Sequence, residues 1–214
     1  MSVFVRNFQQ RVLFSEALLE RDARVLVQLL KADRFDVSIV CAGGKRIKSL
    51  NLKYRRRNVQ TDVLAFPYFE NMKPGVLPNP KLQDDWNLGD VILGMPVIHQ
   101  DCQEDNKSVQ EYLPVLITHG LCHLLGYTHD TEQNLQQMHK KEKEVLSGFN
   151  QVTGYNTKPL LPAITPSDRN EEKKVINFLE YHPQTASCFN SSDARVEKTL
   201  QRYLIKVKNS PLKN

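Results

Sequence analysis

Residues 108–129 read SVQEYLPVLITHGLCHLLGYTH, and their apolar side chains recur at helical spacing. The pattern predicts a buried helix over residues 108–125, whose first turn holds a capping pair, Ser108 and Glu111. Pro114 lies inside that range, so the helix either kinks at the proline or begins there with the proline in its first turn. The stretch after the proline is helical in both cases.

Three histidines cross the end of this helix in the pattern H-x3-H-x5-H: His119, His123 and His129. Residues four apart lie on the same side of a helix, so the first two imidazoles point to one place. Gly126 ends the helix and lets the chain return the third imidazole to that place. Three neutral imidazoles suit zinc and leave a fourth position for water, whereas structural zinc sites close all four positions with protein ligands. The spacing therefore predicts a catalytic metal centre.

The same spacing occurs in the metzincin protease motif, H-E-x-x-H-x-x-G-x-x-H, with one difference. Residue 120 is glycine in this chain, whereas the glutamate of the proteases is the general base that activates water. A peptidase therefore needs another carboxylate in that role, and it is kept as an alternative.

Outward from the helix, apolar alternation or short apolar runs between turn residues predict strands. The predicted strands cover residues 35–42, 61–67 and 88–94, and residues 3–8 also suit a first strand. Apolar stripes predict further helices over 15–32, around Ile47, Leu50 and Tyr54, and over 131–147. A long loop between the second and third predicted strands holds Pro74, Pro78 and Pro80, and is either a functional lid or a solvated insertion.

The 214-residue chain has a formal net charge of +5, but that charge is unevenly distributed. Residues 45–57, KRIKSLNLKYRRR, hold seven basic and no acidic side chains, whereas residues 58–154 sum to −7. Such a run is most often a solvated surface, although beside a metal cleft it also suits phosphate binding. The sequence has no apolar run of about 18 residues and no glycine-rich nucleotide loop, so neither a membrane nor a nucleotide cofactor is expected. Four widely spaced cysteines indicate a reduced compartment.

Three stretches in order resemble the motifs of one family. Residues 119–129, HGLCHLLGYTH, resemble H-G-x-L-H-L-x-G-Y/F-x-H. Residues 50–67, LNLKYRRRNVQTDVLAFP, resemble L-N-x-x-Y-R-x-x-x-x-P-T-D-V-L-S-F-P, and residues 88–94, LGDVILG, resemble L-G-D-I-x-I. These are motifs of the YbeY family of zinc endoribonucleases, and the chain resembles an animal-type member over about residues 2–150. Gln60 and Ala65 replace the family's usual proline and serine, which concerns local loop geometry and not the metal site.

The resemblance implies an α+β fold, with a small mixed β-sheet packed with helices and a central helix that carries the first two histidines. It implies one Zn²⁺ per chain, held by His119, His123 and His129, and catalytic roles for Arg55 and His119. RNA cleavage develops negative charge on phosphorus-bound oxygens, which a metal cation and a guanidinium stabilise. Arg56 and Arg57 join Arg55 as candidates for binding RNA phosphate.

The implied function is that of a single-strand-specific, zinc-dependent endoribonuclease in ribosomal RNA processing, maturation and ribosome quality control. The implied partners are ribosomal RNA and small-subunit ribosomal proteins. Animal relatives are associated with mitochondria and bacterial ones with the cytoplasm, so we expect a mitochondrial protein, with the cytoplasm or nucleus as alternatives. Two other classes stay open: a zinc peptidase without the usual glutamate base, and a non-catalytic ribosome-associated factor stabilised by zinc.

Three further expectations concern residues around the motifs. Asp62 and Asp90 either orient a ligand histidine or cap a turn or strand end. Cys122 is expected to pack and not to bind metal, because it lies off the helix side that carries the histidines. Prolines after Gly154 predict a linker, so residues 1–154 form the metal-dependent endoribonuclease domain and residues 155–214 a linker and a basic, loosely packed C-terminal extension.

Overall fold

The computed structural model describes residues 2–161, which lie within one compact unit, Met1–Ala163. In this part of the chain one sheet contains four strands: β1 (Val3–Asn7), β2 (Asp36–Ala42), β3 (Val63–Pro67) and β4 (Asn87–Gly94). The strand order is β1-β2-β4-β3; β1, β2 and β4 are parallel, and β3 pairs antiparallel with β4 at the edge. The small mixed sheet is therefore confirmed.

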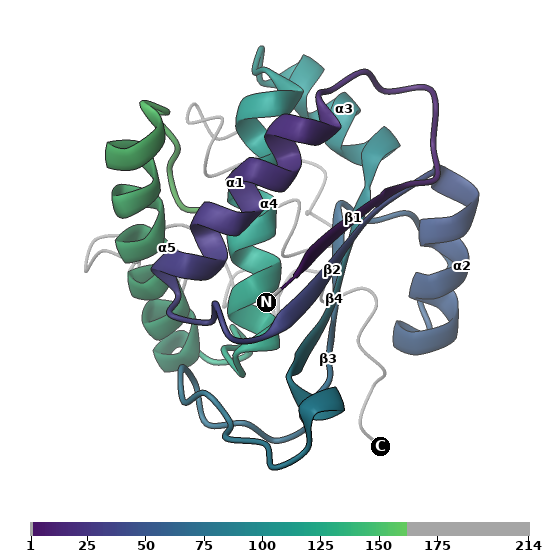
Figure 1. Cartoon of the computed structure of the whole chain (residues 1–214). Coiled ribbons are helices and arrows are strands. Elements are labelled where there is room, and N and C mark those ends of the chain that lie inside the picture. Colours follow the sequence, from purple (N-terminus) through teal and green to yellow (C-terminus); the bar gives the residue numbers. More distant parts are fainter. Residues whose placement is uncertain (1, 162–214) are drawn as a thin grey trace, which may run out of the picture. The chain divides into compact units, whose positions relative to one another are not determined.

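Helices cover both faces of this sheet unequally (Figure 1). The described helices are α1 (Glu16–Leu29), α2 (Gly44–Arg55), α3 (Met95–Glu104), α4 (Val109–Leu124), α5 (Glu132–Thr153) and a short 3-10 turn, Gln83–Asp85. Figure 1 shows α1, α4 and α5 on one side of the strands and α2 on the other. Because α4 contacts β3, β4, α1 and α5, the α+β fold with a central helix is confirmed.

The main core lies between the sheet and the helices α1, α4 and α5. Alternation along β2 sends Val37, Ile39 and Cys41 into this core, where each is at most 1% exposed. A smaller cluster of Ala42, Ile47 and Leu64 lies beneath α2. Each large apolar side chain that is fully buried contributes about 1.5–3 kcal/mol, so the α4 face holds most of the burial energy.

α4 runs without interruption from Val109 through Pro114, so the alternative start at the proline is wrong. Ser108 occupies the N-cap position, but its side chain makes no cap hydrogen bond, and the predicted capping pair is not formed. Buried side chains on several sides of α4 hold the helix between the sheet and its neighbours, which compensates for the helix-breaking tendency of the proline.

Two helices differ from the sequence expectation. α3 was not predicted; Gly94 precedes it, Pro96 lies in its first turn, and it buries a narrow stripe of Met95, Ile98 and Cys102. α5 extends past the expected end at residue 147, because Phe149 continues its buried stripe to the left-handed Gly154.

The chain continues to contact the domain beyond Gly154. Tyr155, Leu160 and Leu161 pack against the main core. The rest of the predicted C-terminal extension, from residue 162, lies outside the described residues. No helix within residues 2–161 has the length and apolar character that crossing a membrane requires.

Candidate metal centre

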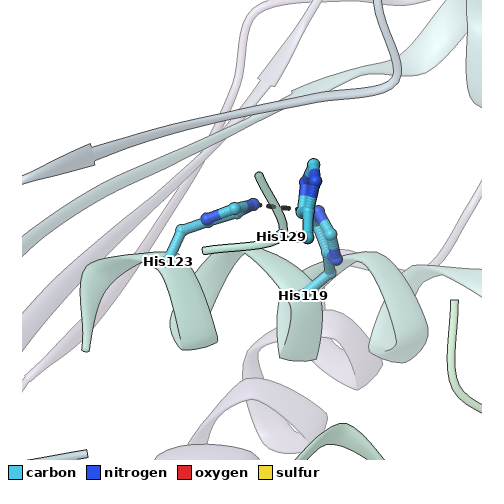
Figure 2. A group of neighbouring side chains, drawn as sticks. All are labelled: His119, His123 and His129. Carbon is cyan, nitrogen blue, oxygen red and sulfur yellow. Dashed lines mark hydrogen bonds between the residues drawn. The ribbon is translucent and has the colours of Figure 1, made fainter. Parts of the chain in front are cut away.

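The end of α4 gathers the three histidines of the motif (Figure 2). Gly126 adopts a left-handed conformation with φ of +82°, and its N–H donates to the His123 carbonyl at 3.0 Å. A β-carbon at this position would lie 2.7 Å from the Met72 carbonyl oxygen, so the turn requires glycine. The reversal places His129 beside His119 and His123, as the spacing predicted.

The long loop between β3 and β4 packs against this turn. The Gly75 N–H donates to the Leu125 carbonyl at 2.9 Å, and Phe69 and Leu77 pack against the main core. A β-carbon at Gly75 would meet the Tyr127 hydroxyl, so the loop lies directly against the residue that follows Gly126. The loop therefore supports the turn that returns His129, which a fully solvated insertion would not do.

The three side chains converge on one point in space. One ring nitrogen from each of His119, His123 and His129 lies within 4.8 Å of the other two, and the Nε2 atoms of His119 and His123 are 3.1 Å apart. Two nitrogens bound to one tetrahedral zinc at about 2.0–2.1 Å lie roughly 3.3 Å apart. The spacing therefore fits a metal ion held by three imidazoles.

Hydrogen bonds on the far side of two rings fix which nitrogens face this point. His123 Nδ1 lies 2.9 Å from the Tyr127 carbonyl oxygen, which only accepts, so this nitrogen carries the proton. His119 Nδ1 lies 2.8 Å from Glu142 Oε1 and donates to that carboxylate. The Nε2 atoms of both rings then face one another across 3.1 Å, at the point where the three imidazoles converge.

The electrostatic environment keeps His123 neutral. Burial, followed by the neighbouring His119 and His129, lowers the pKa of His123 from 6.5 to about 3, and Arg55 contributes to the same shift. An imidazole must be neutral to bind a metal, so protons compete poorly for this ligand near neutral pH.

Glu142 of α5 is the carboxylate that contacts a ligand histidine, and the sequence interpretation missed it. Its side chain is buried (1% exposed), with Oε1 on His119 and Oε2 accepting from the Leu161 N–H at 3.2 Å. Met138, Glu142 and Leu146 follow one another at four-residue spacing along the buried side of α5. A glutamate within that apolar stripe was the available signal, because charged residues are rarely buried unless paired.

The carboxylates proposed earlier for this orienting role do not contact the histidines in any hydrogen bond of the structure. Asp62 Oδ1 accepts from the Thr61 hydroxyl and from the Val63 N–H, so it caps the start of β3. Asp90 is exposed on β4, opposite Phe66. Of the two roles expected for Asp62, the structure therefore shows capping of a strand end.

Cys122 and Gly120 of α4 both lie in closely packed parts of the core. Cys122 is fully buried, and burial raises the pKa of its thiol, as expected of a packing residue. A β-carbon at Gly120 would lie 2.7 Å from Cγ1 of Val91, a buried residue of β4. A glutamate at position 120 would therefore clash with the sheet, which disfavours a protease-like arrangement here.

The three arginines lie at and after the end of α2. Arg55 is its last residue, and Arg56 ends the helix in a left-handed conformation with φ of +56°. All three are exposed overall, yet partial desolvation, and then Arg57, lowers the pKa of the Arg55 guanidinium, while Asp62 opposes this. The structure thus leaves all three arginines at the surface, with the Arg55 guanidinium partly desolvated.

An α+β fold that brings three histidines together at the end of its central helix defines a class of protein with a site that could hold a metal ion. The family model "Endoribonuclease YbeY" matches residues 5–150. A human endoribonuclease YbeY is 44% identical over 160 residues, covering 75% of this chain and 95% of the human one. An endoribonuclease YbeY from Acetivibrio thermocellus is 30% identical over 159 residues, covering 70% and 98%.

The chain therefore belongs to the endoribonuclease YbeY family. A solution structure from Thermotoga maritima also matches, with a TM-score of 0.44 and 20% identity, covering 74% of this chain and 99% of that one.

Proposed function

We propose that this protein is a single-strand-specific, zinc-dependent endoribonuclease that acts on ribosomal RNA in ribosome maturation and quality control. The observation that carries the proposal is the convergence of one ring nitrogen from each of His119, His123 and His129 within 4.8 Å of one another. The names of the relatives, endoribonuclease YbeY, support the reaction class.

The three imidazoles form the ligand set that zinc prefers at catalytic sites, with one position open. His119 and His123 would hold the ion through Nε2, because the Nδ1 atoms are engaged with Glu142 and with the Tyr127 carbonyl. When bound, zinc supplies Lewis-acid stabilisation of the phosphate and of the attacking oxygen.

Arg55 supplies the second positive charge of the reaction. Its guanidinium binds two oxygens of one phosphate in a fork, and this contact strengthens as charge accumulates on those oxygens during cleavage. Other basic side chains of α2 are exposed and attract the RNA backbone: Lys45, Arg46, Lys48 and Lys53. Arg55 therefore positions the scissile phosphate, while these residues hold the flanking nucleotides.

An exposed aromatic side chain in the last turn of α2 supports the preference for single strands. Tyr54 is 56% exposed, and its ring packs edge-on against Phe66 with ring centroids 5.0 Å apart. Unpaired bases stack on exposed aromatic rings, whereas the bases of a duplex stay stacked on one another. An exposed Tyr54 ring on the helix that ends at Arg55 thus fits an unpaired nucleotide.

The test presents the purified full-length protein with single-stranded RNA, duplex RNA and an unfolded peptide, with and without a chelator, beside His123→Ala. We expect cleavage of the single strand only, lost with chelator and in the variant. Peptide cleavage would replace the proposal with a zinc peptidase. Absence of both activities in the zinc-loaded protein would indicate a non-catalytic, ribosome-associated factor.

For the partner and the compartment, we propose ribosomal RNA with small-subunit ribosomal proteins, in mitochondria. Both rest on the resemblance to animal family members. The partner and the compartment are tested together by crosslinking the protein to RNA in cells, separating the organelles and sequencing the crosslinked RNA from each. Crosslinks to cytoplasmic or nuclear RNA would favour the alternative compartments.

A further inference from the structure

We propose that residues 155–161, which follow α5 and lie beyond the residues matched by the family model, are a positioning segment of the metal centre. The segment holds Glu142, and through Glu142 it holds the His119 imidazole in the orientation that metal binding requires. The inference rests on the three-histidine centre as a metal site and not on the proposed reaction with RNA.

The link between the segment and the histidine runs through one buried carboxylate. Glu142 Oε2 accepts from the Leu161 N–H at 3.2 Å, and Glu142 Oε1 accepts from His119 Nδ1 at 2.8 Å. The Leu161 carbonyl oxygen lies 2.8 Å from Nδ1 of His139, one turn before Glu142 on α5. Both backbone groups of Leu161 are therefore fixed to the same helix that carries the carboxylate.

The other end of the segment is anchored near the end of α5. Asn150 makes three hydrogen bonds with Thr157: its Nδ2 donates to the carbonyl at 2.9 Å, and its Oδ1 accepts from the N–H at 2.9 Å and from the hydroxyl at 2.7 Å. The ring of Tyr155 packs on that of Phe149 with centroids 5.4 Å apart. The segment thus returns along α5 from Asn150 toward Glu142 (Figure 1).

Glu142 needs this contact because it is buried. A buried carboxylate oxygen without a hydrogen bond costs about 1–3 kcal/mol or more, so without the Leu161 N–H the side chain would rotate toward another donor or toward water. Either movement weakens its hold on His119 Nδ1. Removing the hydrogen-bond partner of a metal-binding histidine typically costs about 10–100-fold in metal affinity.

The test compares two substitutions at one position in the full-length protein. Leu161→Pro removes the N–H donor, whereas Leu161→Ala keeps the N–H and removes the side chain. Zinc affinity is measured by competition with a chromogenic chelator, and the visible spectrum of the cobalt-loaded protein reports the ligand geometry. We expect Leu161→Pro to weaken zinc binding about tenfold and to change the cobalt spectrum, with Leu161→Ala close to wild type.

Asn150→Ala is a second variant, which removes the hydrogen bonds that anchor the far end of the segment at Thr157. We expect it to weaken zinc binding by about threefold, which is less than the effect of losing the Leu161 N–H itself. Ser15→Ala serves as the matched control, because it removes a helix-cap hydrogen bond to Leu18 in α1 and should lower stability without changing zinc affinity. Wild-type zinc affinity and cobalt spectra in both Leu161→Pro and Asn150→Ala, with only the unfolding temperature lowered, would overturn the proposal. A protein that binds zinc as expected but leaves RNA uncut would contradict the proposed function alone.

Discussion

The metal centre and the basic surface of α2 are built in different ways. The metal centre consists of His119, His123 and His129, whose positions are set by the helix, a glycine turn and buried hydrogen-bond partners. The basic surface, defined here as the basic side chains of residues 45–57, is exposed. A rigid site suits an ion of fixed geometry, whereas an exposed charged surface suits a polymer that binds in many conformations. Substitutions in the two regions should therefore have different effects on zinc binding and on RNA cleavage.

The largest effect should come from the metal centre. His123→Ala removes a ligand, so the variant should bind less than a tenth of the zinc of wild type and lose at least about 100-fold in RNA cleavage. Zinc content by atomic spectroscopy and cleavage of a single-stranded RNA measure both. His99→Ala, a histidine of α3, should leave both values unchanged. Full zinc content in His123→Ala would place the metal elsewhere.

The next effect should come from Arg55, the last residue of α2. Arg55→Ala should leave zinc bound but reduce RNA cleavage by at least about tenfold, because the phosphate loses its guanidinium partner. Arg56→Ala, one residue further on the surface, is the matched control and should change the rate by less than about threefold. Equal losses in the two variants would show that Arg55 acts only through general positive charge.

A stability measurement tests the buried character of the metal centre. The native pKa of His123, about 3, lies below the value of 6.5 in an unfolded chain, so the unfolded state takes up the proton first as the pH falls. The zinc-free protein should be fully stabilised by this group above pH 6.5 and lose on the order of 1–2 kcal/mol between pH 7 and pH 5. Urea unfolding at both values measures it, and the loss should be smaller in His123→Gln. Identical losses in the two proteins would contradict the assignment.

The smallest effect should come from the basic surface alone. A double variant, Arg56→Ala with Arg57→Ala, should weaken binding of single-stranded RNA by a few-fold and make it less dependent on salt, by about 0.7 in the logarithmic slope for each lost phosphate contact. Zinc affinity should not change. Binding isotherms at several salt concentrations test this, and an unchanged salt slope would remove both residues from the RNA contact.

Local periodicity explains what was predictable from sequence. His119 and His123 converge because α-helical spacing fixes their directions, and His129 joins them because Gly126 adopts the left-handed conformation that the turn requires. The strands were predictable for the same reason, since alternation reports burial on one face. In each case the decisive contacts lie within a few residues along the chain.

Contacts between distant segments were not predictable in the same way. Glu142 contacts His119, which lies 23 positions earlier in the sequence, and the Leu161 backbone contacts Glu142, which lies 19 positions earlier. The Leu161 group is a backbone N–H, which every residue except proline has, so the sequence does not indicate this contact. Asp62 and Asp90 were candidates because they stand in motifs, but the choice of carboxylate depends on how α5 packs against α4.

The most direct test of the central claim is a titration of zinc-free, full-length protein with zinc while RNA cleavage is measured. The claim is that the three histidines form one metal centre on which cleavage depends. The rate should rise from near zero in proportion to bound zinc and level off at one ion per chain. A rate that is the same without zinc, or that keeps rising after the histidine site is filled, would contradict it.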